Sequence, residues 1–335
     1  MSPADGYDVI VLGEVLVEIH SDIPLQRASD GTPLRLSFSG DALNAAAAAA
    51  AAGARTALFT LVGNDELSVP LLDRVRALGV DTALVRRAER PNGAYLLSAD
   101  VHGDREFVYW RTGSAASTLG PADVERFTAE LSAARSLVVS GITPALSAST
   151  REATLAAARI VHDAGGRVTY DPNFRSRLTT PAEARDVLAA MAPYTGLLTP
   201  SCPGDAGTLL GTTDPGEAAD RGLKLGAAAV AVTAGAESVL LADGSGRWRV
   251  PVPRNPDQVD ATGAGDSFTG TVTARLALGD GLGAAVAHAV AAASLSVSGR
   301  GGTGHVPGFV ATAELAARAV RAESLVREKE REGER

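Results

Sequence analysis

The sequence predicts an α/β fold in which helices cover both faces of a mostly parallel central sheet. Short apolar runs alternate with helical patterns along most of the 335 residues, and this alternation is typical of parallel sheets that are buried on both faces. The chain is 45% hydrophobic but only 4% aromatic, so its core must be built from Ala, Val and Leu. In such folds, ligands bind outside the carboxyl ends of the strands.

The first elements form a βαβ unit. We expect a strand over 8–12, a helix over 42–52 that Gly53 ends, a strand over 56–62 and a helix over 69–78. The alanine run in the first helix is interpreted as structural, because Ala is the best helix former and its small size permits close packing on a sheet. Further strands are expected at 137–140, 167–171, 196–199 and 228–233, with helices near 151–164, 181–191 and 217–225.

Two segments depart from this alternation and predict a small antiparallel sheet. Residues 14–19 with 34–39, and residues 94–109 around a turn at 102–104, alternate in the manner of antiparallel strands.

Composition narrows the class of protein. A formal net charge of −8 argues against an electrostatic nucleic-acid binder. The single cysteine, Cys202, excludes an internal disulfide and a cysteine-based zinc site, which fits a reducing compartment. The N-terminus has no basic region followed by an apolar stretch, and no apolar span is long enough for a membrane helix. We therefore expect a cytoplasmic protein with no membrane or nucleic-acid partner.

The segment from Val259 to Phe268 carries the strongest chemical signal. Gly263, Ala264 and Gly265 directly precede a stretch that can be helical, so their backbone N–H groups can converge on one anion at the positive end of a helix dipole. Asp266 stands at that junction, where it can accept a proton from an attacking hydroxyl. This pattern indicates phosphoryl transfer. The alternative is a tight turn in which Asp266 is only a helix N-cap.

The run Asp260-Ala-Thr-Gly-Ala-Gly-Asp266-Ser-Phe resembles the D-x-x-G-A-G-D-x-F signature of the ribokinase-like (PfkB) carbohydrate kinases. Ser39-Gly40-Asp41-Ala42-Leu43-Asn44 resembles the glycine pair and asparagine of that family, with Ser in place of the first Gly. The resemblance extends from about residue 9 to about residue 307. It implies a ribokinase-like fold over 1–321, followed by a charged tail at 322–335 that we interpret as frayed.

The resemblance also assigns a role to the small sheet. Segments at about 14–20, 33–39 and 93–111 would form a lid over the substrate, which excludes water so that ATP is not simply hydrolysed. Lid sheets of this family often pair between subunits, which makes a homo-oligomer through the lid plausible.

The arginines point to the acceptor. Residues 107–117, which include Tyr109 and Arg111, resemble a segment of the 2-keto-3-deoxygluconate kinases, and Asp171-Pro-Asn173-Phe-Arg175 resembles their D-x-N-x-R strand end. Two arginines that converge on one carboxylate would orient an acidic sugar. The alternative is that Arg111 and Arg175 make ordinary salt bridges. Arg177 is expected to face solvent.

The remaining substrate contacts follow by position in the resemblance. Glu14 falls where this chain resembles the keto-deoxy-acid kinases. Glu18 falls where fructokinases and ribokinases usually carry an aspartate that holds sugar hydroxyls, and it either binds substrate or points outward from a lid strand. The predicted substrate-binding residues are Gly40, Asn44, Tyr95, Tyr109, Arg111, Ile142, Arg175 and Asp266.

The resemblance places ATP beside Thr233, Gly235, Gly263 and Gly265, with Mg²⁺ on its phosphates. The family's N-x-x-E motif aligns with 202–205, so Asp205 would act on Mg²⁺ through water and Cys202 would replace the asparagine. Asp260 with carbonyls of 298–304 is a candidate K⁺ site, although the glycine-rich stretch is equally explained as a loop over the adenine. The five histidines show no ligand spacing and are expected at the surface or as caps: His20, His102, His162, His288 and His305.

These observations predict an ATP-dependent kinase for a small sugar or sugar acid, with 2-keto-3-deoxygluconate as the first candidate. Asp266 would be the base, and Gly263, Ala264 and Gly265 would stabilise the developing charge. The alternative within the class is a fructokinase or another sugar or nucleoside kinase. The alternative of another class is a sugar-binding sensor without catalysis, which the altered asparagine position favours weakly.

Overall fold

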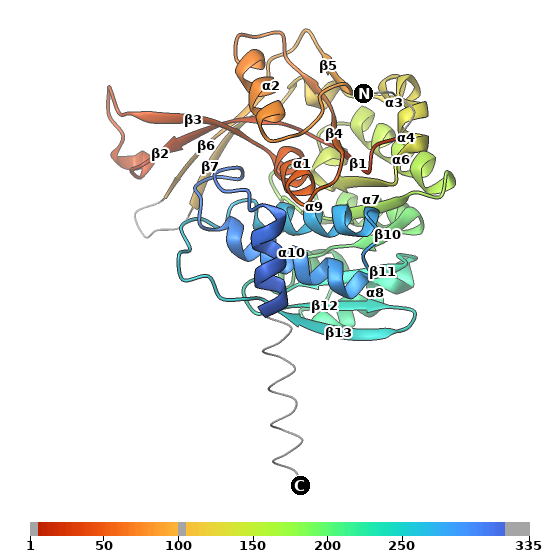
Figure 1. Cartoon of the computed structure of the whole chain (residues 1–335). Helices are drawn as coiled ribbons and strands as arrows, with labels where there is room; N and C mark the ends of the chain where they lie inside the picture. Colours follow the sequence, from red (N-terminus) through yellow and green to blue (C-terminus); the bar gives the residue numbers. More distant parts are fainter. Residues whose placement is uncertain (1–5, 100–104, 319–335) are drawn as a thin grey trace.

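The computed structural model describes residues 6–99 and 105–318. The predicted turn at 102–104 and the predicted tail at 322–335 lie outside these residues. Within them, one sheet forms the body of the molecule, with strands in the order β13-β12-β11-β10-β9-β8-β1-β4-β5 (Figure 1). The strands are β1 (Val9–Leu12), β4 (Thr56–Val62), β5 (Val85–Arg87), β8 (Ser136–Ser140), β9 (Arg167–Asp171), β10 (Thr195–Leu198), β11 (Ala229–Thr233), β12 (Ser238–Asp243) and β13 (Gly246–Pro251).

The pairing in this sheet is parallel from β5 through β11 and antiparallel at the end that β12 and β13 form. The predicted α/β class with a mostly parallel sheet is therefore confirmed. The β12–β13 hairpin and the short strand β5 were not predicted. Because the parallel strands run in one direction, the loops after β1, β8, β9, β10 and β11 all emerge at one edge of the sheet.

Helices cover both faces of the sheet, as the sequence predicts. One face packs on α1 (Asp41–Ala51), α2 (Ser68–Ala77), α9 (Ala264–Ala277) and α10 (Leu282–Ser296). The other face packs on α3 (Pro121–Arg126), α4 (Thr128–Ala133), α6 (Ala148–Asp163), α7 (Pro181–Met191) and α8 (Pro215–Leu225), while α5 (Ile142–Ala145) is a single turn after β8.

Two of these helices touch backbone to backbone. Gly270 of α9 faces α1, where a Cβ would lie 2.0 Å from the carbonyl oxygen of Ala45. Only a glycine on one helix and alanines on the other permit this approach, which explains the alanine run of α1. The close packing brings the first turn of α1 beside the first turn of α9.

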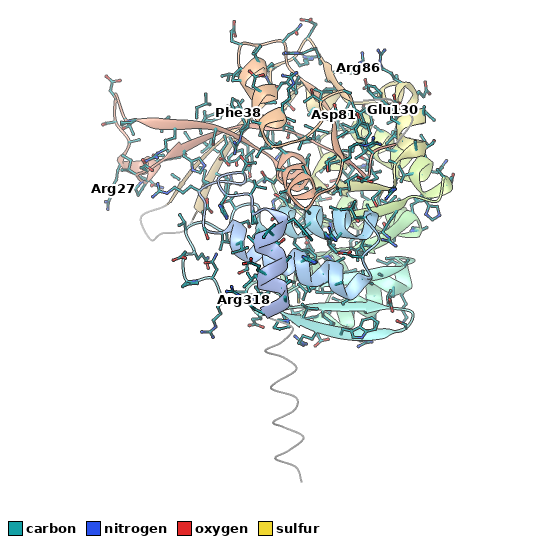
Figure 2. The ribbon with its side chains drawn as sticks, in the orientation of Figure 1. Arg27, Phe38, Asp81, Arg86, Glu130 and Arg318 are labelled. Carbon is teal, nitrogen blue, oxygen red and sulfur yellow. The ribbon has the colours of Figure 1, made fainter. Side chains whose placement is uncertain are left out.

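A second sheet forms the lid, with strands in the order β3-β2-β6-β7. Its strands are β2 (Leu16–Ser21), β3 (Leu34–Ser39), β6 (Gly93–Ala99) and β7 (Arg105–Trp110). The β2–β3 and β6–β7 pairs are antiparallel, whereas β2 and β6 run parallel. The lid extends away from the body, and Figure 2 shows Arg27 near its far end and Phe38 where it joins the body.

None of the helices within residues 6–99 and 105–318 has the length and apolar character that a bilayer crossing requires.

Candidate active site

A cavity of about 890 Å³ lies between the lid and the carboxyl edge of the main sheet. Its wall combines lid strands, the first turns of α1 and α9, and the loops after β9, β10 and β11. Most of the predicted site residues line it: Gly40, Asn44, Tyr95, Tyr109, Arg111, Ile142, Arg175, Asp205, Thr233, Gly263, Gly265 and Asp266. The wall residues do not include Ala264, Gly235 or Asp260.

Asp266 lies in the first turn of α9 and opens to this cavity. Gly263 is the residue before the helix and adopts φ 78°, a left-handed conformation that favours glycine. Burial, together with the negative charge of Asp41, raises the pKa of Asp266 to about 7. The Asn44 amide and the Arg175 charge act in the opposite direction. A carboxylate with this pKa is suited to accept a proton near neutral pH.

The residues at the start of α9 differ in whether their backbone N–H group donates a hydrogen bond within the turn. The Ala264 N–H donates to the Ala261 carbonyl at 3.3 Å, so this amide is used in the turn. Gly263 and Gly265 line the cavity, and a Cβ at Gly265 would meet no other atom within 4 Å. The predicted anion pocket therefore narrows to the two glycines, with Ala264 outside the wall.

Asn44 contacts Asp266 directly. Asn44 Nδ2 donates to Asp266 Oδ2 at 2.8 Å, and Ser39 Oγ donates to Asn44 Oδ1 at 3.0 Å. Asn44 was predicted to bind substrate, and its amide nitrogen already donates to Asp266. Gly40 supplies the turn before α1 with φ 117°, where a Cβ would lie 2.7 Å from the Glu14 carbonyl oxygen.

Arg111 lines the cavity, and its positive charge is paired with a buried carboxylate. Its Nη2 lies 2.6 Å from Oε2 of Glu14, whose side chain is fully buried. Ser114 Oγ donates to the other carboxylate oxygen at 2.7 Å. Burial raises the pKa of Glu14 and outweighs the opposite effect of Arg111. Glu14 therefore lies behind Arg111, points inward and is not among the residues that line the cavity.

Arg175 and Arg177 are the exposed arginines of the cavity wall. Both follow β9, and Arg175 Nη1 donates to the Phe174 carbonyl at 3.1 Å. Arg177 is exposed, as expected, but it is not turned away: its Nη1 donates to the carbonyl of Phe107 in lid strand β7 at 2.5 Å. The loop after β9 is thereby joined to the lid.

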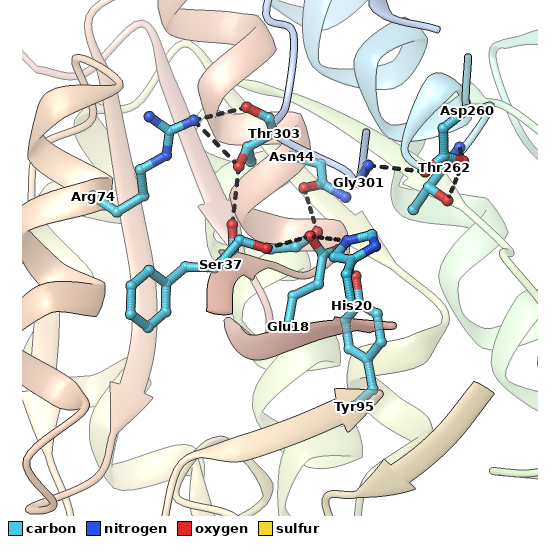
Figure 3. Close-up of polar contacts among 12 residues, drawn as sticks. Glu18, His20, Ser37, Asn44, Arg74, Tyr95, Asp260, Thr262, Gly301 and Thr303 are labelled. Atoms are coloured by element: carbon cyan, nitrogen blue, oxygen red, sulfur yellow. Dashed lines mark hydrogen bonds and ion pairs between the residues drawn. The ribbon is translucent and has the colours of Figure 1, made fainter. Parts of the chain in front are cut away.

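Glu18 belongs to the inner side of the lid. Its Oε1 accepts from Ser37 Oγ at 2.7 Å and lies 2.8 Å from Nε2 of His20, while Tyr95 OH donates to its Oε2 (Figure 3). These hydrogen bonds outweigh burial and lower the pKa of Glu18, and the same contact raises the pKa of His20. The expectation that His20 is a surface or cap residue was wrong, because the lid holds it as the partner of Glu18.

An aromatic wall covers the cavity from the lid. The rings of Tyr95, Phe107 and Tyr109 lie with centroids 5.7 to 5.9 Å apart. The hydroxyl of Tyr95 is engaged by Glu18, which leaves its ring as the surface that a sugar would meet. Phe107 was not among the predicted contacts, although it stands in the segment quoted for the resemblance.

Two acids of the cavity were missed. Asp41, at the start of α1, has its pKa raised by burial, and Asp171, at the end of β9, has its pKa raised well above the usual value by burial and by Asp205 and Asp266. Each sits inside a motif that the sequence already marked, one residue after Gly40 and two before Asn173. Because like charges repel one another, several carboxylates in one cavity cannot all be ionised at the same time.

The nucleotide side differs from the expectation at Cys202. Cys202 Sγ lies 3.2 Å from the Thr213 carbonyl and is not part of the wall, whereas the preceding residue, Ser201, is. Ser201 Oγ donates to Asp205 Oδ2 at 2.7 Å, and the Phe174 N–H donates to Asp205 Oδ1 at 2.8 Å. The polar group beside Asp205 is therefore the hydroxyl of Ser201, and the thiol does not replace an asparagine in the cavity.

Asp260 ties the glycine-rich stretch to the start of α9. Its Oδ1 accepts from the Thr262 N–H at 2.9 Å and Oγ1 at 2.8 Å, and its Oδ2 accepts from the Gly301 N–H at 2.8 Å (Figure 3). Thr303 Oγ1 in turn donates to the Phe38 carbonyl of the lid at 2.9 Å. The stretch 298–304 thus contacts the lid and Asn44, and both the K⁺ site and the loop over the adenine stay predictions.

No group of three or more His, Cys, Asp or Glu side chains in the described part of the chain is arranged to hold a metal ion by itself. Asp205 can still take part through water, since each carboxylate oxygen has two acceptor positions and Phe174 uses only one on Oδ1. This arrangement suits Mg²⁺, which keeps several waters and relies on substrate phosphates for other contacts.

An anion pocket at a helix start, a carboxylate of raised pKa and a covering lid define a phosphotransferase site. Residues 8–307 match the family described as pfkB family carbohydrate kinase, so the chain belongs to that family of ATP-dependent sugar kinases.

Among its relatives, the 2-dehydro-3-deoxygluconokinase of Bacillus subtilis (strain 168) is 36% identical over 229 residues, which cover 67% of this chain and 69% of that protein. The protein of the same name from Escherichia coli (strain K12) is 32% identical over 283 residues, which cover 81% of this chain and 89% of that protein. A solved E. coli structure described as ribokinase II in complex with ATP and Mg²⁺ has a TM-score of 0.82 at 25% identity, covering 92% of this chain and 99% of that chain.

Proposed function

We propose that the chain transfers the terminal phosphoryl group of ATP to a primary hydroxyl of a small sugar acid, with 2-keto-3-deoxygluconate, converted to its 6-phosphate, as the physiological acceptor. The observation that carries the proposal is Asp266, a partly open carboxylate at the start of α9 whose pKa burial raises to about 7. The name of the relatives supports the acceptor, since 2-dehydro-3-deoxygluconate is the same compound.

In the proposed reaction, the acceptor hydroxyl attacks the γ-phosphorus and its proton passes to Asp266. The bond between the γ-phosphorus and the bridging oxygen breaks, and ADP leaves with that oxygen. The N–H groups of Gly263 and Gly265 would stabilise the charge that develops on the transferring group, aided by the helix dipole. Thr233 and Gly235, at and after the end of β11, are proposed to hold the nucleotide.

Asp205 would hold Mg²⁺ through water on the nucleotide side of the cavity, with Ser201 fixing its carboxylate. When bound, Mg²⁺ supplies neutralisation of the phosphate charge. The carboxylate of Asp260 remains a proposed part of a K⁺ site. Stimulation of turnover by K⁺ over Li⁺ at constant ionic strength, lost in Asp260→Asn, is the expected result.

The acid of the substrate is proposed to lie near the exposed guanidinium groups of Arg175 and Arg177. Arg111 contributes less to binding of the carboxylate than its position in the wall suggests. Its charge is balanced by Glu14, whose Oε2 lies 2.6 Å from Arg111 Nη2. Gly40, Ile142 and the rings of Tyr95 and Tyr109 would enclose the carbon chain. A neutral ketose would supply no carboxylate to balance the positive charge of these two arginines.

The test measures ADP release with 2-keto-3-deoxygluconate, fructose, ribose and adenosine in the presence of Mg²⁺. We expect kcat/KM to be highest with the keto-acid, and Asp266→Asn to lower kcat by about 100-fold or more while both substrates still bind. A higher kcat/KM with fructose favours the fructokinase alternative. Sugar binding without ADP release by the wild-type chain favours the sensor.

We also propose a homo-oligomer through the lid. On its outer side, Leu36 and Val108 stand in one row across the sheet and are 54% and 40% exposed, and Trp110 in the next row is 55% exposed. Soluble chains rarely leave such a row uncovered. Analytical ultracentrifugation should find a dimer or larger assembly that Leu36→Lys with Trp110→Lys dissociates, whereas Trp248→Lys on β13 does not. A monomeric wild-type chain contradicts the proposal.

A further inference from the structure

We propose that Asn44 is a positioning residue for Asp266: it holds one carboxylate oxygen of the base so that the other oxygen faces the acceptor hydroxyl. The inference rests on the proposed role of Asp266 as base. It assigns to Asn44 a task other than sugar binding.

The contact joins the two halves of the chain. Asn44 Nδ2 lies 2.8 Å from Asp266 Oδ2, across 222 residues of sequence. A hydrogen bond to an ionised carboxylate is shorter and stronger than a neutral one, so it can fix the rotation of that group. Asn44 is only 6% exposed, which protects the bond from competition by water.

Chemistry decides which end of the Asn44 amide meets Asp266. An ionised carboxylate only accepts hydrogen bonds, so the NH₂ end must face it and the carbonyl end must point away. That carbonyl oxygen receives the hydroxyl of Ser39 at 3.0 Å. Ser39 stands where the family pattern has a glycine, so the hydroxyl that locks the amide is a feature of this chain.

Two glycines confine the amide from the opposite side. A Cβ at Gly302 would lie 2.3 Å from Asn44 Nδ2 and 2.3 Å from Ser39 Oγ, and a Cβ at Gly263 would lie 3.1 Å from the same nitrogen. The amide therefore packs against bare backbone of the 299–304 stretch. Any side chain at 302 would push Asn44 out of line with Asp266.

Burial and the negative charge of Asp41 from α1 raise the pKa of Asp266, whereas the Asn44 amide and Arg175 after β9 lower it. Asp171 at the end of β9 is a further acid nearby, and Asp266 raises the pKa of Asp171. Loss of Asn44 removes a donor while the acids stay. Asp266 then ionises at higher pH and its carboxylate is free to rotate. At a given pH a smaller fraction of Asp266 is ionised, and its free oxygen is directed less well at the acceptor hydroxyl.

The experiment compares pH profiles of Asn44→Ala and of the wild-type enzyme with 2-keto-3-deoxygluconate and ATP. We expect kcat at pH 7 to fall about 10-fold or more, and the acid limb of kcat to move to higher pH, so that the deficit shrinks toward pH 9. Asn44→Ser, which keeps a donor, should recover part of the rate. Asn64→Ala, an exposed asparagine, serves as the control and should leave the profile unchanged.

Three results separate this inference from its rivals. An acid limb that stays in place while KM for the sugar rises shows that Asn44 binds substrate, and overturns the proposal. In the Asp266→Asn background, Asn44→Ala should cause no further loss of kcat, and an additive loss overturns the proposal as well. If Asp266→Asn alone retains near wild-type kcat, the base assignment fails and not the Asn44 contact.

A second variant tests the same contact without altering either residue. Gly302→Ala should shift the acid limb in the same direction as Asn44→Ala, since the new methyl group occupies the position of the amide. Gly304→Ala, in the same stretch, would meet the backbone of Arg300 and not Asn44. It controls for a general disturbance of the loop, and an equal shift in both variants contradicts the inference.

Discussion

Glu14 and Arg111 form a buried ion pair in which the guanidinium faces the cavity and the carboxylate lies behind it, with 2.6 Å between Arg111 Nη2 and Glu14 Oε2. The positive charge that a substrate acid would meet is therefore partly balanced before any ligand arrives. The pair also joins β7's end to the loop after β1, so it links the lid to the main sheet.

Glu14→Gln should lower the free energy of unfolding by about 3 kcal/mol, because it removes the carboxylate that pairs directly with the buried Arg111 charge. Urea unfolding at pH 7.5 measures the change. Asp73→Asn, which breaks the exposed Arg76–Asp73 pair, is the matched control and should cost less than about 1 kcal/mol. Equal effects of the two substitutions would show that the buried pair contributes no more to stability than the exposed pair.

The rate of the wild-type enzyme should depend on the ionisation of Asp266. Because a base must be unprotonated to act, kcat/KM should rise with pH through about 7 and then level off. Asp41→Asn removes a negative charge that raises the pKa of Asp266, so the limb should move to lower pH. A limb that moves upward in Asp41→Asn would contradict this electrostatic account.

The same raised pKa makes the opposite prediction for stability. The folded state binds the proton of Asp266 more tightly than the unfolded chain does, so ionisation between about pH 4 and about pH 7 costs stability. Asp266→Asn should therefore raise Tm relative to wild type at pH 8 and have a smaller effect at pH 4. Thermal unfolding at both pH values is the measurement, and a lower Tm at pH 8 would be the contrary outcome.

Arg175→Gln and Arg177→Gln should each raise KM for the keto-acid about 10-fold, because a charge-assisted hydrogen bond is lost. The effect on fructose should be smaller, since fructose has no carboxylate. Arg167→Gln, at the opposite end of β9, is the control. If Arg177→Gln raises KM for both sugars equally, its contact with Phe107 secures the lid and does not recognise the acid.

Ser201→Ala and Cys202→Ser should differ in their Mg²⁺ dependence. Ser201 donates to Asp205 and lines the cavity, whereas Cys202 does neither. Titration of Mg²⁺ at fixed ATP should give a weaker apparent affinity for Ser201→Ala and an unchanged one for Cys202→Ser. A large effect of Cys202→Ser alone would show instead that the thiol acts at the Mg²⁺ site.

Local sequence patterns predicted those elements whose structure depends mainly on their own residues. The strand at 56–62 and the helix at 181–191 have the bounds that the sequence predicted, because each combines a clear period with a terminal signal. The β12–β13 hairpin was missed because its Gly244 turn joins an apolar strand to one rich in arginine. Nothing in that second strand shows a buried face.

The site was predictable to the extent that its residues share short motifs. Asp266 and Gly263 stand three residues apart, and the motif places both at a helix start. The partner of Asp266 is 222 residues away and the partner of Arg111 is Glu14, almost 100 residues earlier, and neither pairing leaves a mark in the local pattern. Burial creates these pairs, since an isolated charge or amide in the interior must find a partner.

The 299–304 stretch touches elements from the first quarter of the chain, through Thr303 with Phe38 and Arg74 and through Gly302 with Asn44. Proteins are made from the N-terminus, so the sugar side of the cavity is translated long before the glycines that confine it. A nascent chain that ends before residue 302 has the lid and Asn44 but lacks the backbone that packs against them. The contacts that close this side of the cavity therefore form only when synthesis of the chain is nearly complete.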